Sequence, residues 1–374
     1  MEIEKLKNII ESCHLNFLIG SGASRKHLGT LGNIEEILTD LAESKVTPDR
    51  KQLLDAIIKH QYFKIAIKGN LEILDGDSDE LKKTRKAYEL LIQNFNVFLK
   101  RRKSNLLSKQ VNIFTTNMDL FLEYTFENEK IEYNDGFSGK LNPKYGTENF
   151  HNSIYKLSTH YDIRSEVPLF NLFKLHGSLN WHESDNGIVY DYSLKSLKSI
   201  AQIEFVEDDF ISIFDENGNP LGLTAIIEKV EDLDIQKKQI HDSFLEAYNK
   251  LVMINPTKDK FATTTQNLLF YELLRMYSNH LERENSVLFV VGFSFADEHI
   301  REITKRVAIS NPTLLIIIFA FNDKAKQSIL SLTGNRSNIV VLAPEEGQNS
   351  YTLENINTEF FSKVVDKIEE PNII

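Results

Sequence analysis

Seven short apolar runs, each bounded by turn residues, are spaced along this chain, and this pattern constrains its fold more than any other feature. Several runs are separated by segments that place apolar residues three and four positions apart, which is the periodicity of an amphipathic helix. Strand, helix, strand alternation of this kind favours a parallel sheet with helices on both faces. The predicted strands are residues 14–20, 111–115, 169–175, 251–254, 286–292, 314–321 and 338–342.

Two segments depart from this alternation. Residues 33–103 have helical spacing and no convincing strand, which predicts a helical insertion. Residues 180–242 are acidic and rich in turns, which predicts a smaller irregular insertion. The prediction is therefore an α/β protein whose Rossmann-like parallel sheet belongs to one domain, residues 1–32 and 104–345. A C-terminal helical extension, residues 346–374, follows it.

The charge of the chain disfavours nucleic acid as a direct partner. Its net charge of −11 would repel a phosphate backbone. The densest basic run, residues 100–103, follows a stretch of helical periodicity and is expected to be a solvated helix end. No direct nucleic-acid binding is therefore predicted.

Cysteine usage and hydropathy indicate a cytoplasmic compartment. Cys13 is the single cysteine, which excludes an internal disulfide and a zinc site built from several thiolates. The first residues are acidic where a secretory signal peptide is basic, and an apolar signal core is lacking. The most apolar run, residues 314–321, is far shorter than the roughly 20 residues that span a bilayer. Neither export nor a membrane is therefore expected.

A glycine-rich turn follows the first predicted strand, where residues 17–24 read FLIGSGAS. Gly20 and Gly22 permit tight turning and close approach of the backbone, and the amides at the start of a following helix can hold a pyrophosphate. The dehydrogenase fingerprint is not met, because no third glycine follows and no ribose-binding acid is identifiable about 20 residues on. This disfavours hydride transfer. A glycine turn without a ligand is the alternative.

Polar side chains close the second and third predicted strands. Asn117 and Asp119 lie in the sequence IFTTNMD, and ligands of open α/β sheets bind at the carboxyl ends of strands. His176 lies in KLHGS, and a histidine there can accept a proton at neutral pH as a general base. The alternatives are that Asn117 or Asp119 caps the next helix and that His176 is structural.

Two further strand ends carry polar groups. Ser294, in the sequence VGFS, can bond a ribose hydroxyl, whereas the alternative is that Ser294 or Asp297 caps the helix that begins near Glu298. Asn322 closes the next predicted strand with an amide, which an ordinary turn explains equally well.

In order along the chain, GSGAS from Gly20, TTNMD from Thr115, KLHGS from Lys174 and VGFS from Val291 resemble the pattern of the sirtuin family. The resemblance extends from about residue 14 to residue 345. It looks most like the bacterial sirtuin-like enzymes of antiphage defence, whose members degrade NAD instead of deacylating lysine. The resemblance thereby implies NAD as the substrate.

The resemblance also implies roles for individual residues. Asn117 and Asp119 would form the pocket for the nicotinamide ribose and carboxamide, and His176 would be the catalytic histidine. Gly292 and Ser294 would lie against the adenosine ribose. The full set of implied cofactor-binding residues is Gly20, Ser21, Gly22, Ala23, Ser24, Arg25, Thr116, Gly292, Ser294 and Asn322.

The chain departs from the sirtuin pattern at three places. Protein-deacylating sirtuins usually carry a four-cysteine zinc module, which a chain with Cys13 alone cannot build, so no metal site and no zinc are expected. The acyl-lysine groove that depends on this module is therefore not expected either. Thr116 stands where the family usually has Gln, and Arg25 stands in a loop without the usual Pro-Asp-Phe-Arg run.

These features predict an NAD hydrolase that cleaves the nicotinamide–ribose bond, as an NAD-depleting effector of antiphage defence. The alternatives are a sensor or scaffold that binds NAD or ADP-ribose without turnover, and an NAD-dependent protein deacylase. The amphipathic surface of residues 33–103 predicts a homo-oligomer, with packing on its own sheet as the alternative. The resemblance further implies a HerA-type ATPase as partner.

Overall fold

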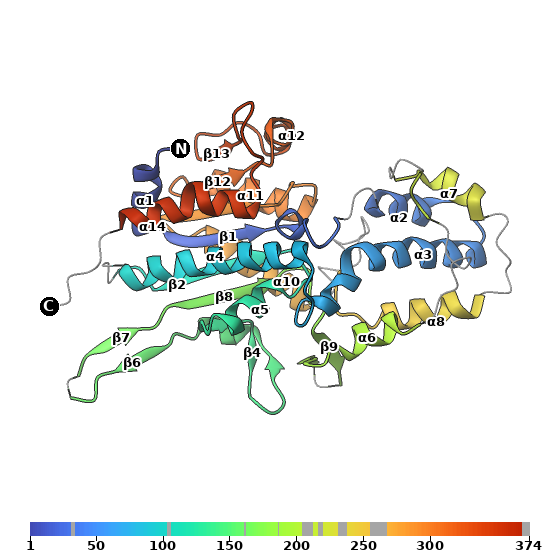
Figure 1. Cartoon of the computed structure of the whole chain (residues 1–374), viewed down its shortest axis with the longest axis horizontal. Helices are drawn as coiled ribbons and strands as arrows, with labels where there is room; N and C mark the ends of the chain where they lie inside the picture. The colour runs from blue at the N-terminus through green and yellow to red at the C-terminus, as the bar shows by residue number, and fades with distance from the viewer. Residues whose placement is uncertain are drawn as a thin grey trace.

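A seven-stranded parallel sheet forms the centre of the protein (Figure 1). The computed structural model describes residues 1–30, 34–102, 106–160, 162–185, 187–203, 212–215, 220–230, 238–254 and 268–368. The strands of the sheet are β1 (His14–Ile19), β2 (Gln110–Thr115), β3 (Tyr133–Asn134), β8 (Leu169–Lys174), β11 (Ser286–Val291), β12 (Leu315–Phe319) and β13 (Ile339–Leu342).

The strand order is β13-β12-β11-β1-β2-β8-β3, and every neighbouring pair is parallel. The chain moves outward from β1 through β2 to β8 and β3, then returns to place β11 on the other side of β1. The direction of winding therefore reverses between β1 and β11. In open α/β sheets the crevice beyond the carboxyl ends of strands at such a switch point is where ligands bind.

The predicted parallel sheet is confirmed, and one predicted strand is wrong. Residues 251–254 do not join the sheet, because Met253 makes only an isolated antiparallel bridge with Gly177. The backbone groups of this run pair instead with the turn after β8, where the Ile254 amide donates to the His176 carbonyl at 3.0 Å. The run is apolar because it is buried against that turn. The other six predicted runs are strands of the sheet.

Helices cover both faces of the sheet (Figure 1). Alternate residues of each strand face opposite layers, so Phe17 packs on Phe95 at 4.6 Å between ring centroids while Phe114 packs on Tyr277 at 5.0 Å. Burial on both faces explains why the strands are continuous apolar runs. One layer contains α1 (Ile3–Ser12), α4 (Asp79–Arg101), α5 (Phe121–Asn128), α13 (Leu353–Ile356) and α14 (Ser362–Lys367). The other contains α10 (Leu268–Leu281), α11 (Glu298–Ser310) and α12 (Asp323–Thr333).

A separate group of helices lies beside the sheet (Figure 1). It joins segments that are distant in sequence, because α3 contacts both α7 and α8 while α2 contacts α7. Its members are α2 (Ile34–Glu43), α3 (Pro48–Tyr62), α6 (Lys195–Ala201), α7 (Leu223–Val230) and α8 (Lys238–Tyr248). The two segments predicted as insertions therefore pack on each other, whereas α4, from the first of them, packs on the sheet.

Two small antiparallel sheets complete the described fold. One has the order β4-β5-β10-β9 and the other is the hairpin of β6 and β7. Their strands are β4 (Phe137–Ser138), β5 (Lys144–Tyr145), β6 (Tyr155–Leu157), β7 (Arg164–Glu166), β9 (Trp181–Ser184) and β10 (Gly187–Tyr190). Within the described ranges, none of the helices combines the length and apolarity needed to cross a membrane.

A row of buried asparagines crosses the middle of the sheet. Asn16, Asn112 and Asn171 are aligned on β1, β2 and β8. The Asn112 amide donates to Oδ1 of Asn16 at 2.9 Å, and the Asn171 amide donates to Oδ1 of Asn112 at 3.0 Å. A shift of any strand by one residue would bury these amides without partners, which is unfavourable. The asparagine row therefore fixes the register of the three strands.

We predict that Asn112→Leu lowers the free energy of unfolding by about 2–4 kcal/mol, because it leaves polar groups of both neighbouring asparagines buried and unpaired. Urea unfolding measures this difference. The exposed Asn335 provides a matched control, and Asn335→Leu is expected to change stability by less than about 0.5 kcal/mol. Equal stability of the two variants would contradict the role of the row.

Acid is expected to destabilise the protein through its histidines. Burial, assisted by the charge of Arg283, lowers the pKa of both His14 and His280 to about 4. The unfolded chain then binds more protons than the folded one between pH 4 and the ordinary histidine value of 6.5. The stability contributed by the neutral rings is fully present above pH 6.5 and is lost as the pH falls toward 4. The thermal midpoint should therefore decrease as the pH is lowered from 6.5 to 4, and this decrease should be smaller in His280→Asn.

Candidate active site

A cavity of about 390 Å³ opens at the switch point of the sheet. Turns after β1, β2, β8 and β11 all contribute to its lining, so four strand ends separated in sequence meet there. Its volume lies within the range of small-molecule sites, roughly 300–1,000 Å³. The predicted residues that line it are Ser21, Gly22, Ser24, Arg25, Thr116, Asn117, Asp119, His176, Gly292 and Ser294.

The glycine-rich turn packs directly on the turn after β11. A side-chain Cβ on Gly20 or Gly22 would lie 2.5 or 2.8 Å from the Gly292 carbonyl oxygen, closer than real contacts allow. Gly292 itself has a φ of +65°, in the left-handed region that favours glycine. These glycines are therefore required to bring β1 and β11 together at the cavity.

The turn after β1 differs from the predicted helix start. It is a single 3-10 turn, η1 (Ser21–Ser24), and not the first turn of an α-helix. The Gly22 amide donates to the Gly292 carbonyl at 2.9 Å, and the Ala23 amide donates to the Gly20 carbonyl at 3.0 Å. Because these two amides are engaged within the protein, they are not available to hold a diphosphate.

Asn117 is held over the end of β1. Its side-chain amide donates to the Gly20 carbonyl at 3.1 Å, and its backbone amide donates to the Thr115 hydroxyl at 3.0 Å. The side-chain Oδ1 is buried and has no hydrogen-bond partner among the described residues. The Tyr88 hydroxyl lies nearby but bonds Ser24. A buried amide oxygen without a donor, on a residue that lines the cavity, is a candidate contact for a ligand or water.

Asp119 joins the β2 turn to the glycine-rich turn. Its Oδ2 accepts from the Ser24 hydroxyl at 2.7 Å, and Ser24 also bonds the Tyr88 hydroxyl at 2.9 Å. Burial and the charge of Asp119 raise the pKa of Tyr88 well above its ordinary value, which keeps that hydroxyl protonated. Neither Asn117 nor Asp119 is the N-cap of α5, which is Leu120. The arrangement gives Asp119 a structural task in addition to its place in the cavity.

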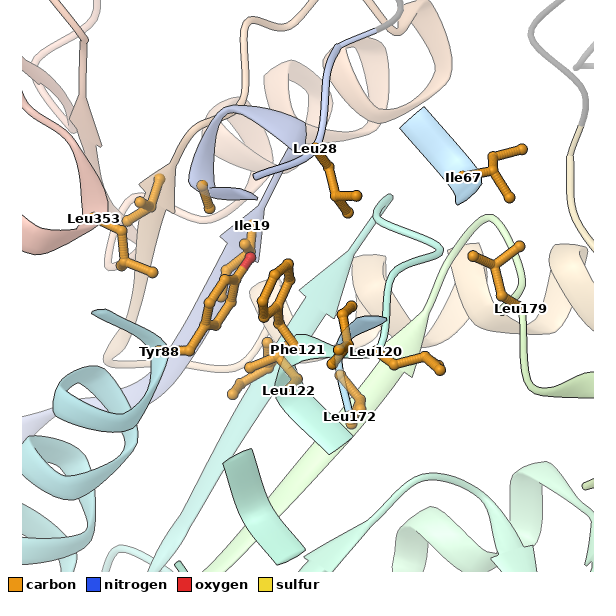
Figure 2. Close-up of a cluster of buried hydrophobic side chains, with 14 of the residues drawn as sticks. Ile19, Leu28, Ile67, Tyr88, Leu120, Phe121, Leu122, Leu172, Leu179 and Leu353 are labelled. Atoms are coloured by element: carbon orange, nitrogen blue, oxygen red, sulfur yellow. The ribbon is translucent and has the colours of Figure 1, made fainter. Parts of the chain in front are cut away.

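A stacked aromatic pair supports this network from below. The Tyr88 and Phe121 rings lie face to face, with centroids 5.3 Å apart and planes 2° from parallel. Figure 2 shows them beneath Ile19, at the end of β1, with Leu28 above and Leu120 and Leu122 beside them. The hydroxyl of Tyr88 thus reaches Ser24, a residue of the cavity lining, from an apolar surrounding.

A buried ion pair fixes the turn that carries Asn117. Lys174 Nζ lies 3.0 Å from Glu123 Oε1, and both side chains are buried. The same ammonium donates to the backbone carbonyl of Asp119 and lies 3.5 Å from that of Asn117. Burial raises the pKa of Glu123, while the charge of Lys174 opposes this shift. Lys174 therefore anchors the β2 turn to the end of β8.

His176 occupies the turn that follows β8. Gly177 has a φ of +81°, and a Cβ there would lie 2.1 Å from the Val252 carbonyl, so only glycine fits. The His176 side chain is largely buried, and its Nε2 lies 3.3 Å from Oδ2 of Asp297. His176 and Asn117 thus line the same cavity as the glycine-rich turn.

The remaining predicted residues divide into two groups. Ser294 lines the cavity, and the alternative role predicted for Asp297 is confirmed because it caps α11 by accepting from the Ile300 amide at 3.2 Å. Asn322 caps α12, Gly20 is the residue before η1 and Ala23 is a buried residue of η1, and these three are absent from the described lining of the cavity. A second cavity, of about 340 Å³, adjoins the first and is lined partly by Ala23.

The helices beside the sheet supply part of the wall, which the sequence did not indicate. Glu35 on α2 and Tyr62 on α3 line the cavity, together with Leu28. Burial, with the charge of Glu35, raises the pKa of Tyr62. A helical pattern marks where a helix forms but not which distant strand ends it covers, so this wall becomes visible only in three dimensions.

The described residues contain no group of three or more histidine, cysteine, aspartate or glutamate side chains placed to hold a metal ion. The polar groups that line the cavity are amide, imidazole, hydroxyl, carboxylate and guanidinium groups.

No protein-family model and no curated protein matches the chain. Two solved structures of Sir2 enzymes are similar to it over nearly their whole lengths. One, from work on the mechanism and regulation of Sir2 enzymes, has a TM-score of 0.38 and 11% identity, covering 98% of this chain and 96% of that one. The other, a Sir2 mutant with a p53 peptide and NAD, has a TM-score of 0.38 and 10% identity, covering 97% and 98%.

We predict that Lys174→Met lowers the free energy of unfolding by about 3–5 kcal/mol, because it leaves Glu123 buried without its counter-ion. Chemical unfolding measures the loss. A second variant that also carries Glu123→Leu removes the stranded charge and should recover most of the stability. If the single variant were as stable as the parent protein, the pair would not anchor the β2 turn.

Proposed function

We propose that this protein binds NAD in the cavity at the switch point and hydrolyses its nicotinamide–ribose bond, releasing nicotinamide and ADP-ribose. The observation that carries the proposal is the meeting of Asn117 and His176 in one cavity with the glycine-rich turn. The resemblance of the four strand-end motifs to the sirtuin family supports the choice of NAD.

Hydrolysis requires stabilisation of positive charge on the ribose and a placed water molecule. The bond between the ribose carbon and the nicotinamide nitrogen breaks, and its electron pair neutralises the pyridinium ring. Water forms the new bond to the ribose carbon. In this proposal Asn117 positions that water and His176 takes its proton, an effect worth roughly 10²–10⁴-fold in rate.

The proposed binding residues are the predicted ones that line the cavity, which excludes Gly20, Ala23 and Asn322. Arg25 is a cation of the cavity lining, and a guanidinium can bind a diphosphate through paired hydrogen bonds. Ser21, Ser24 and Thr116 contribute hydroxyl groups to the same lining. Asp119, already bonded to Ser24, would hold the ribose end of the site in shape.

The biological setting that we propose is NAD depletion in antiphage defence, with activity restrained until a trigger arrives. This setting rests on the resemblance to bacterial sirtuin-like defence enzymes. A homo-oligomer and a HerA-type ATPase are the partners proposed on the same ground. The proposed domains are residues 1–32 with 104–345, the insertion 33–103 and the C-terminal extension 346–374.

We predict that the purified full-length protein releases nicotinamide and ADP-ribose from NAD, and that Asn117→Ala and His176→Ala each lower the rate by about 10²–10⁴-fold. Mass spectrometry of the products measures the rate. His182→Ala, at an exposed histidine of β9, is the matched control and should retain the parent rate.

The alternative functions predict different results with the same purified proteins. Equal turnover by the parent and both site variants would reject the assignment of these residues. Calorimetric binding of NAD without product would favour a sensor or scaffold. Removal of acetyl groups from an acetyl-lysine peptide would favour a deacylase.

A further inference from the structure

Asp297 is buried beside His176, and the steps proposed above for NAD hydrolysis do not involve it. Its Oδ2 lies 3.3 Å from His176 Nε2, and the two side chains are only 8% and 14% exposed. The residues come from opposite sides of the switch point, because Asp297 follows β11 and His176 follows β8, with β1 and β2 between them in the sheet. Both line the cavity.

We propose that Asp297 is a positioning residue for His176, whose carboxylate orients the imidazole and stabilises its protonated form during NAD hydrolysis. The inference rests on the proposed function. Because Nε2 lies 3.3 Å from the Asp297 carboxylate, the proposal assigns Nδ1 as the ring nitrogen that accepts the proton from water. The positive charge formed on the ring is then balanced by the carboxylate, as in other carboxylate–histidine pairs.

The two oxygens of Asp297 have different neighbours. Oδ1 accepts from the Ile300 amide at 3.2 Å and so caps α11. A cap needs one oxygen, and serine or asparagine would supply it equally well. The placement of Oδ2 against His176 is therefore not explained by capping alone.

The backbone that delivers Asp297 is unusual. Phe295 is buried and has a φ of +61°, in the left-handed region that a bulky residue seldom adopts. The Arg301 guanidinium secures this turn by donating to the Phe295 carbonyl at 3.0 Å. Strained backbone of this kind concentrates at functional sites, where surrounding contacts hold it in place. Here the strained turn places a carboxylate against the histidine.

Other ionisable groups face the pair and must be held constant in any test. Arg25, Glu35, Tyr62 and Asp119 line the cavity from η1, α2, α3 and the β2 turn. On α11 itself, Glu298 and Arg301 lie 3.7 Å apart. Because substitution of Asp297 alone changes none of these groups, a shift in pH dependence would report on the Asp297 carboxylate.

We predict that Asp297→Asn and Asp297→Ser each lower kcat for NAD by about 10²-fold or more, while KM and the thermal midpoint stay close to the parent values. Both substitutions keep a capping oxygen but remove the charge. The acid limb of the kcat/KM profile should move to lower pH in Asp297→Asn, because the imidazolium loses its counter-ion. Glu298→Gln, at an exposed neighbour on α11, is the control and should leave kcat and the profile unchanged.

Two results would overturn the inference. If Asp297→Ser keeps the parent kcat and pH profile, and only Asp297→Ala loses stability, Asp297 is a helix cap and nothing more. Where NAD is not hydrolysed at all, NMR titration of the His176 ring in the parent and in Asp297→Asn still tests the pair. A lower titration midpoint in the variant supports it, and an unchanged midpoint contradicts it.

Discussion

The direct backbone contact between the turn after β1 and the turn after β11 is the constraint on which the site depends. Both turns lie at the point where the sheet reverses its winding, and glycines at positions 20, 22 and 292 remove the side chains that would separate them. Because the contact is made by backbone atoms, it leaves the neighbouring side chains to line the cavity. The crevice is thus an outcome of chain topology and of three missing Cβ atoms together.

Around this contact the polar side chains form a connected hydrogen-bond network. Lys174 fixes the carbonyls of the β2 turn, Asp119 ties that turn to Ser24, and Tyr88 bonds Ser24 from an apolar base. An unpaired charge or hydroxyl in such a place would be unfavourable, and most of these groups have a partner. Asn117 is different, since its Oδ1 is buried without one. A hydrogen-bonded network that holds a polar group in place is what a preorganised site requires.

The sequence was informative where a local pattern has one physical cause. Continuous apolar runs predicted six strands of the sheet, and polar residues after them predicted the four strand ends that line the cavity, together with a fifth, Asn322, that does not line it. The sequence was uninformative where a structural feature depends on residues that are distant along the chain. Residues 251–254 are apolar because they cover the His176 turn, and the two-residue strand β3 is too short to show a period. The pairing of His176 with Asp297 joins residues more than a hundred positions apart, and spacing along the chain carries no sign of it.

The asparagine row has a consequence for how this protein can vary. Asn16, Asn112 and Asn171 bond one another across three strands, so a change at one of them alone strands its neighbours. Replacement of all three by apolar residues would leave no amide unsatisfied and would be tolerated far better, but the strands would then lack the feature that distinguishes one alignment from the next. We therefore expect strong epistasis among these positions: each single substitution should destabilise the protein, whereas joint replacement of all three should destabilise it much less.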